Sequence, residues 1–578
     1  MMRDTYSQAH SADKMLLFTE KYKYPTNYSN KIHYSDISPA QQAPIHKNSD
    51  KLLAAEQHTF QTKRPIIKHF SDMRRGLAVT IKQKTDILMP EVLFTGGDDA
   101  AVDRRILRMA EEGQLRKLYQ GVYTSNLASP PEAVVTRNWL NIVGHLLPGG
   151  VISYRSAHDA KPFAGRLYMT RGQRPRTIEL PGLTVRVLPG PVAVTGDVVY
   201  KKLFLASQAW WLLENMATGR GVSERVLSAE DLEAQLDKML LIRGEYRFNE
   251  LRDNCRALAA VLGRDKEFKR LDGIMGALLG THESKKLRSK QALARAGGLP
   301  YDPARLELFD TLFGRLRVEA LPELPAAADS GSARETFAFF EAYFSNTIEG
   351  TTFLVREAEE IVFEGKLIPN RAEDSHDVLG TFQAAMQPPW RDQPPGTADE
   401  FLHWLKSVNA LVMRSRLDKN PGEWKDQNNQ AGATVFVDPT LVQGTLREGF
   451  ARIVALEDPL ARALMTMFVI SEVHPFKDGN GRTARLAMNC VLSAAGRSRI
   501  IVPTVYREDY LLPLKAMSNN SDATPYLRAM TRIQSWTVAF DYSLTRNDVY
   551  EALLRCNAFE EDLKNYKLLF PDSNPLPH

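Results

Sequence analysis

The most continuous apolar stretch of the chain covers residues 460–473 and has the composition of a buried helix. Asp458 and Pro459 precede it as an N-cap and a proline at the first helical position. Apolar residues then recur at helical spacing as far as Gly496, a residue typical of helix C-termini. The pattern therefore predicts two helices joined by the polar turn at 474–485. Neither stretch is long enough to cross a bilayer.

A further helix is predicted upstream, starting at the capping box formed by residues 332–335. Phe337, Phe340 and Phe344 recur at the spacing that places apolar side chains on one helix face. Gly350 would end this helix.

The front half of the chain shows two hydrophobic periodicities, one typical of strands and one typical of helices. Alternating residues predict strands at 166–170, 177–180 and 183–188, with glycine and proline in the connections. From 203 to about 318 the period is helical, which indicates a packed core without recognisable chemistry.

A compact basic module is predicted at 76–125, before these strands. Val102, Ile106 and Met109 form an apolar stripe on one helix, Gly113 ends that helix, and a short hairpin follows. A helix followed by a basic hairpin is the layout of a winged helix-turn-helix. The stretch 109–123 resembles the N-terminal domain of AbiEi-type antitoxins, which are DNA-binding repressors, and the similarity covers roughly residues 76–220. The resemblance implies that an arginine helix enters a major groove and that the wing touches phosphates. The candidate DNA contacts are Arg104, Arg105, Arg108, Arg116 and Lys117.

The same module also allows an alternative. Acidic residues, Asp98, Asp99, Glu111 and Glu112, lie close to the arginines and weaken the positive field. A winged helix that binds protein or serves only as a scaffold therefore stays open.

The sequence thus predicts a multidomain, mainly α-helical protein. Its expected parts are an N-terminal winged helix-turn-helix with a small α+β region, a helical middle, and a C-terminal all-α domain with a β-hairpin flap. The boundaries are a disordered tail at 1–72, the winged helix at 76–125, the α+β and helical region at 126–320, a Pro/Ala-rich linker at 321–333, the C-terminal domain at 334–545, and a last helix and tail at 546–578.

Composition narrows the class of protein. The 578 residues are 43% hydrophobic and 25% charged, as in globular proteins generally, and the net charge of +5 is too small to argue nucleic-acid binding by itself. Cys255, Cys490 and Cys556 lie far apart, without metal-binding spacing, and fit buried thiols in a reducing compartment. We find no signal peptide and expect a cytoplasmic protein without a membrane anchor. A homo-oligomer is left open.

The first seventy or so residues have no sustained period. Tyrosines interleave with lysines there, as at Tyr22, Lys23 and Tyr24, and could stack on single-stranded nucleic acid. A disordered tail is the favoured interpretation. A start at Met73, with the upstream segment as an extension of the gene model, is the third alternative.

The turn at 474–485, HPFKDGNGRTAR, gathers groups that suit a polyphosphate. His474 can accept a proton near neutral pH, and Asp478 is a carboxylate of the kind that shares Mg²⁺ with phosphates. Gly479 and Gly481 let the backbone approach an anion at the start of the second helix. Arginines can fork onto phosphate oxygens.

This turn resembles the signature of the Fic family, HPFxDGNGRxxR, at every specified position. The resemblance implies transfer of AMP from ATP to a protein hydroxyl. It implies that His474 deprotonates the target and that Asp478 holds Mg²⁺. The implied nucleotide-binding residues are Phe476, Asp478, Gly479, Asn480, Gly481, Arg482 and Arg485, with Arg485 reaching the γ-phosphate.

Residues 345–350, SNTIEG, resemble the inhibitory motif of the same family, (S/T)xxxE(G/N). Ser345 and Glu349 lie four residues apart and so share a helix face. The resemblance implies that Glu349 pairs with Arg485 and occupies the place of the γ-phosphate. Gly350 completes the motif, and the enzyme is expected to be mostly inactive as purified.

Between the two motifs, residues 421–439 are predicted to form a turn and a short hairpin. In the family such a flap docks the substrate backbone by strand addition, so a protein partner is expected there. Two other functions stay open. One is a transcriptional regulator in which the Fic domain has a minor role, and the other is a Fic enzyme with a different nucleotide donor.

Overall fold

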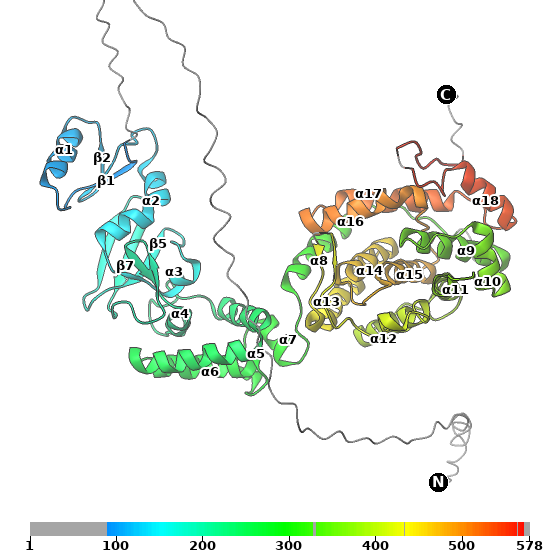
Figure 1. Cartoon of the computed structure of the whole chain (residues 1–578), viewed down its shortest axis with the longest axis horizontal. Helices are drawn as coiled ribbons and strands as arrows, with labels where there is room; N and C mark the ends of the chain where they lie inside the picture. Colours follow the sequence, from blue (N-terminus) through cyan, green and yellow to red (C-terminus); the bar gives the residue numbers. More distant parts are fainter. Residues whose placement is uncertain (1–88, 327–330, 433, 563, 572–578) are drawn as a thin grey trace, which may run out of the picture. The chain divides into compact units, whose positions relative to one another are not determined.

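The computed structural model describes residues 89–326, 331–432, 434–562 and 564–571 (Figure 1). The predicted tail at 1–72, the alternative start at Met73 and the first part of the predicted winged helix, residues 76–88, lie outside the described residues. None of the described helices combines the length and apolar character needed to span a membrane.

The first described elements form a small sheet with one helix. Strands β1 (Val92–Phe94), β2 (Arg116–Tyr119) and β3 (Val122–Thr124) pair antiparallel in the order β1-β3-β2. Helix α1 (Ala100–Glu111) is capped by the Asp99 carboxylate, and Gly113 follows it with φ of 74°. The helix and the basic hairpin are therefore as expected, whereas the complete winged helix stays a prediction because residues 76–88 are not described.

The predicted apolar stripe of α1 is only partly correct. Ile106 is buried and Met109 packs beside it, but Val102 is 48% exposed. The reason is the size of the partner surface. Ile106 packs with Leu115 and Tyr123 in a small cluster, and this cluster does not extend to the first turn of the helix.

A six-stranded sheet follows, in the order β6-β7-β5-β4-β9-β8. The three strands predicted from alternation are confirmed as β5 (Arg166–Thr170), β6 (Arg176–Leu180) and β7 (Leu183–Leu188), whose inward residues fill one core. The remaining elements here are β4 (Val151–Ile152), β8 (Val198–Tyr200), β9 (Leu203–Leu205), α2 (Pro131–Leu146), α3 (Tyr154–Asp159) and α4 (Gln208–Asn215).

The helical middle that the sequence predicts is also present. It contains α5 (Ala229–Leu262), α6 (Asp265–Leu278), the 3₁₀ turn η1 (Ser284–Lys286) and α7 (Lys290–Ala296). These helices share a core with α4, in which Trp210 and Phe248 are buried. Gly244 interrupts the long helix α5 with φ of 72°, a conformation that favours glycine.

Helix α8 (Pro303–Leu316) precedes the predicted linker, yet it packs into the C-terminal core. Its buried face lies against α13 (Val442–Val454) and α14 (Pro459–Val473), where the rings of Phe309 and Phe468 meet edge to face with centroids 6.1 Å apart. The described part of the linker, 321–326, is hydrogen-bonded to residues 496–498. Helix α8 therefore belongs to the same packed core as the helices that follow the linker.

The C-terminal part is helical, as predicted, and its two central helices are α14 and α15 (Asn480–Ala494) (Figure 1). Asp458 caps α14 as expected. Helix α9 (Gly331–Ile348) begins one residue before the predicted cap at Ser332. The other elements are α10 (Val355–Glu364), α11 (Ala372–Met386), α12 (Ala398–Val412), η2 (Leu417–Lys419), β10 (Gln430–Ala431), β11 (Thr434–Val435), η3 (Pro439–Leu441), η4 (Thr504–Tyr506), α16 (Arg507–Asn520), α17 (Thr524–Val538) and α18 (Arg546–Arg555).

The predicted flap is present as the short antiparallel hairpin of β10 and β11. The expected burial of the three thiols is also confirmed, because Cys255, Cys490 and Cys556 are all buried and free.

Candidate functional site

The polar turn between α14 and α15 is held in shape by its own side chains. His474 ends α14 in the left-handed region, with φ of 50°, and Gly479 adopts φ of 77° just before α15. The Asn480 amide accepts from the Phe476 N–H and donates to the Phe476 carbonyl, both at 2.8 Å. Both ends of the Asn480 amide bind this backbone, and its expected contact with the phosphates stays a prediction. Its contribution in the structure is the shape of the loop.

Asn409, which the sequence did not reveal, supports the loop through two hydrogen bonds. Asn409 of α12 donates to the Asp478 carbonyl at 3.0 Å and accepts from the Gly422 N–H at 3.0 Å. A Cβ at Gly479 would lie 2.7 Å from the Met413 sulfur, so only glycine fits there. The sequence signal that could have indicated Asn409 is a single polar residue among apolar ones, because Leu405, Val408 and Val412 of α12 are also buried.

His474 is placed to act as a base. Its ring stacks on Phe436 of the flap with centroids 3.9 Å apart, and its Nδ1 lies 3.4 Å from the Ser471 carbonyl. Burial, and then the positive charge of Lys425, lower the pKa of His474 to about 4. The imidazole is therefore neutral at pH 7. If Nδ1 carries the proton toward Ser471, Nε2 is free to accept one.

Lys425 is a second residue whose position the sequence did not reveal. Its Nζ is buried and donates to the Asn429 Oδ1 at 2.7 Å and to the Val473 carbonyl at 3.3 Å. Burial lowers the pKa of Lys425 to about 8. Lys425 therefore ties the segment before the flap to the end of α14 and places a positive charge near His474.

Arg482 points into the protein. Its Nη1 donates to Asp377 of α11 at 2.6 Å and to the Asn346 Oδ1 at 3.2 Å, and the side chains of Arg482 and Asp377 are 4% and 0% exposed. Asp377 also accepts from Arg416 at 2.8 Å. The ion pair with Asp377, which the sequence did not reveal, ties α15 to α11. The expected contact of Arg482 with a phosphate stays a prediction.

Arg485 points toward the residues of the predicted inhibitory motif. Its guanidinium donates to the Ser345 Oγ at 3.0 Å, to the Ser345 carbonyl at 2.8 Å and to the Glu349 Oε1 at 2.7 Å. Burial disfavours the charged form of Glu349, but the charge and the hydrogen bond of Arg485 outweigh it and hold its pKa below the ordinary value. Gly350 follows with φ of 91° and ends the helix as expected.

The Glu349 carboxylate lies directly over the N-terminus of α15. A Cβ added at Gly481 would be 2.1 Å from the Glu349 Oε1, so the first turn of the helix and the carboxylate are in close approach. Unpaired N–H groups and the helix dipole favour an anion at this position. The protein therefore places its own carboxylate where an anionic ligand would bind.

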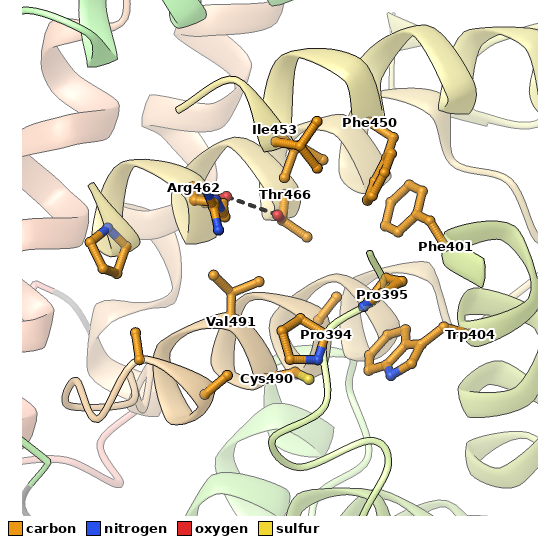
Figure 2. A pocket seen from close by; sticks show the side chains of 15 residues that line it. Pro394, Pro395, Phe401, Trp404, Phe450, Ile453, Arg462, Thr466, Cys490 and Val491 are labelled. Carbon is orange, nitrogen blue, oxygen red and sulfur yellow. Dashed lines mark hydrogen bonds between the residues drawn. The ribbon is translucent and has the colours of Figure 1, made fainter. Parts of the chain in front are cut away.

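His474, Glu349 and Arg485 line one cavity of about 240 Å³. Glu349, Gly481 and Arg485 line one part, His474 and Phe436 another, and Tyr510 and Lys515 of α16 contribute further lining. Another cavity, of about 190 Å³, is lined mainly by apolar residues of α12 to α15, and Figure 2 shows the rings of Phe401, Phe450 and Trp404 along one side of it. The second cavity contains none of the motif residues named above, so the chemistry belongs to the first.

Asp478 is the candidate metal ligand. Its side chain is 41% exposed, and its Oδ1 accepts from the Gly479 N–H at 2.6 Å and lies 3.7 Å from the Arg482 Nη2. Within the described residues there is no cluster of three or more acidic, histidine or cysteine side chains that could hold a metal alone. A single exposed carboxylate fits Mg²⁺ that is shared with nucleotide phosphates.

The candidate DNA-binding residues lie far from this site in sequence. Arg104, Arg105 and Arg108 on α1 and Lys117 on β2 are exposed. Arg116 is engaged within the fold, because its guanidinium donates to the Leu127 carbonyl at 2.6 Å and to the Ser129 carbonyl at 3.3 Å. Four of the five side chains are thus accessible to a partner.

Residues 401–492 match the model of the Fic/DOC family. The C-terminal part of the chain contains a Fic domain. The match includes the turn at 474–485, the flap and α12 from Phe401 onward, but neither Glu349 nor α8.

Relatives with the same domain are similar over about a third of the chain. The protein adenylyltransferase fic-1 of Caenorhabditis briggsae is 27% identical over 208 residues, which cover 34% of this chain and 40% of the relative. The protein adenylyltransferase Fic of Drosophila erecta is 26% identical over 234 residues, 39% of this chain and 46% of the relative. The chain therefore spans less than half the length of these relatives.

Among solved structures, a Fic domain containing signaling protein from Bacteroides thetaiotaomicron is 18% identical to this chain. The similarity covers 43% of this chain and 97% of that one, with a TM-score of 0.32.

Proposed function

We propose that the Fic domain is a protein adenylyltransferase that moves AMP from ATP to a Ser, Thr or Tyr hydroxyl of a protein. The observation that carries this proposal is a neutral His474 in the same cavity as the anion-binding N-terminus of α15. The names of the relatives, protein adenylyltransferases, support it. ATP is the substrate that the proposal requires.

The transfer is an in-line displacement at the α-phosphorus. The target oxygen forms a bond to this phosphorus, the bond to the β-phosphate oxygen breaks, and pyrophosphate leaves. Nε2 of His474 takes the hydroxyl proton. The backbone N–H groups of Gly479 and Gly481 and the guanidinium of Arg485 would orient the phosphates. Asp478 would hold Mg²⁺, which supplies charge neutralisation on the phosphates.

We also propose that Glu349 keeps the enzyme off. Its carboxylate is paired with Arg485 and covers the first turn of α15, where the outer phosphates of ATP would bind. Two negative groups in one position repel, so ATP would bind with its α-phosphate misaligned for attack. Ser345 supports this arrangement by holding Arg485 from the other side.

The proposal is tested by intact-mass analysis of Glu349→Gly protein after incubation with ATP and Mg²⁺. We expect a mass gain of one AMP, on the protein itself or on an added target. The matched control is Glu349→Gly/His474→Ala, which should gain none. A gain that persists without His474 would overturn the assigned chemistry, and a gain only with another nucleotide would change the donor.

A second candidate function is DNA binding by the N-terminal module in a cytoplasmic regulator. The exposed arginines on α1 favour it, and the winged helix at 76–125 is the proposed fold. Binding to DNA from its own promoter should weaken with salt, and Arg104→Ala/Arg105→Ala should weaken it further. Equal binding by the variant would remove this candidate.

A further inference from the structure

One arginine outside the family match connects helix α8 with two elements that line the cavity at His474. Arg305 lies in the first turn of α8, and its side chain is 15% exposed. Its Nη1 donates to Glu472, two residues before His474, and its Nη2 donates to the carbonyl of Val435 in the flap. One guanidinium therefore links α8, the catalytic helix α14 and the flap.

Glu472 is the buried centre of this link. Its side chain is 4% exposed, and its second oxygen accepts from the Ser518 hydroxyl of α16 at 2.5 Å. Ala431, Thr434, Glu472 and Ser518 all line the cavity that contains His474. The contacts of Glu472 with Arg305 and with Ser518 thus connect α8, α14 and α16 in one continuous chain.

The flap needs such support because it is very short. Strands β10 and β11 have two residues each, and Val435 is 53% exposed. An isolated two-stranded hairpin is marginally stable in water. Asn429 holds the base of the flap by donating to the Phe476 carbonyl at 3.0 Å, and Phe436 rests on His474. Arg305 gives strand β11 a charge-assisted hydrogen bond from outside the hairpin.

The first turn of α8 is itself firmly fixed. The Asp302 N–H donates to the Thr445 hydroxyl at 2.9 Å, and Gly444 lies so close to Pro300 that a Cβ would be 2.1 Å from the Pro300 carbonyl oxygen. Arg305 therefore projects from a rigid base on α13 and not from a mobile segment.

We propose that Arg305 is a positioning residue that holds the flap over His474, so that the protein-docking edge of the Fic domain is completed by a helix outside residues 401–492. This inference rests on the proposed function for its effect on transfer. In this proposal α8 has a second role beside packing, because it fixes the position of β11 relative to the catalytic helix α14.

The test compares Arg305→Met with Arg315→Met, a control on the same helix. Arg315 pairs with Glu319 and is 46% exposed. Hydrogen exchange of the amides at 434–437 should accelerate by about tenfold or more in Arg305→Met and remain unchanged in Arg315→Met. Equal exchange in both variants would overturn the proposal whether or not the protein transfers AMP.

A second variant separates the flap tie from the buried charge. Arg305→Met/Glu472→Gln removes both charges, and the amide that it introduces on α14 can still bond the Ser518 hydroxyl. If Arg305 acts through Val435, exchange in the flap stays fast in this double variant. If exchange returns to the wild-type rate, the effect came from the unpaired Glu472 carboxylate and the proposal is wrong.

Activity supplies the third readout, in the Glu349→Gly background. Arg305→Met should lower transfer to a protein hydroxyl by about tenfold, mainly through a higher KM for the protein, and leave the Kd for ATP with Mg²⁺ within about twofold. Equal transfer with and without Arg305 would overturn the positioning role. Absence of transfer in the Glu349→Gly parent would count against the proposed function and not against Arg305, which the exchange data test independently.

Discussion

Arg482 and Arg485 lie three residues apart on α15, and their environments differ sharply. Arg482 faces the protein interior and pairs with Asp377, which is 0% exposed. Arg485 pairs with Glu349, whose side chain is 33% exposed and lines the cavity with His474. Both arginines are themselves almost completely buried, so their own exposure does not distinguish them.

The difference lies in the acidic partner. Removing one partner of a buried ion pair leaves an uncompensated charge, so loss of Asp377 should destabilise the fold. Glu349 can be replaced at Arg485 by another anion that enters the cavity. We call these the structural pair (Arg482–Asp377) and the exchangeable pair (Arg485–Glu349). The following predictions test whether the two pairs separate stability from activity.

The largest expected effect is on activity. In the Glu349→Gly background, His474→Ala should lower the rate of AMP transfer by about 10²–10⁴-fold, because the target hydroxyl loses its base. The free energy of unfolding, measured in guanidinium chloride, should change by less than about 1 kcal/mol. His474→Asn is the control for the left-handed backbone at this position, which asparagine tolerates. Substantial transfer by either variant would contradict the role of His474.

The structural pair should respond in the opposite way. Asp377→Asn leaves Arg482 and Arg416 without their shared charge and should lower the free energy of unfolding by about 3–5 kcal/mol. The matched control is Asp374→Asn on the same helix, which pairs with Arg371 and Arg416 at a more exposed position and should cost about 1 kcal/mol or less. Equal losses of unfolding free energy in the two variants would contradict a larger contribution from the buried Arg482–Asp377 pair.

A smaller effect separates the contribution of charge from that of volume in the exchangeable pair. Glu349→Gln keeps a side chain over Gly481 but loses the ion pair with Arg485. We expect transfer about tenfold faster than in the wild type and slower than in Glu349→Gly. If Glu349→Gln is as active as Glu349→Gly, the negative charge alone inhibits; if it is as inactive as the wild type, the volume alone does.

The smallest effect concerns pH. The pKa of His474 is lowered to about 4, so the neutral, reactive ring is lost only as the pH falls through that value. The transfer rate of Glu349→Gly should then vary by less than about twofold between pH 5.5 and 7.5, where an ordinary histidine would lose about tenfold. Loss of the Glu349 charge, which favours the protonated ring, shifts the pKa further in the same direction. A rate that rises tenfold across this window would contradict the low pKa.

The sequence predicted those features whose causes are local. Asp458 before Pro459 predicted the start of α14, and the alternation of apolar and polar residues predicted β5 to β7. Helix caps and hydrophobic periodicity depend on residues that are close in sequence. The two helices joined by the turn at 474–485 were likewise predicted from residues close in sequence.

Features that depend on distant residues could not be predicted. Asp377 lies more than one hundred positions from Arg482, and nothing near either residue indicates that they pair. Val102 was assigned to a buried stripe because the period shows which residues share a face but not how large the partner surface is. Lys425 contacts the Val473 carbonyl and Arg305 contacts Glu472 only because the fold brings these distant residues together.

The most direct test of the account is the single-turnover rate of AMP transfer by the wild type and by Glu349→Gly at saturating ATP and Mg²⁺. The account predicts that the variant is faster by more than about tenfold, because Glu349 no longer covers the first turn of α15. Equal rates in the two proteins would contradict the claim that this carboxylate holds the enzyme inactive.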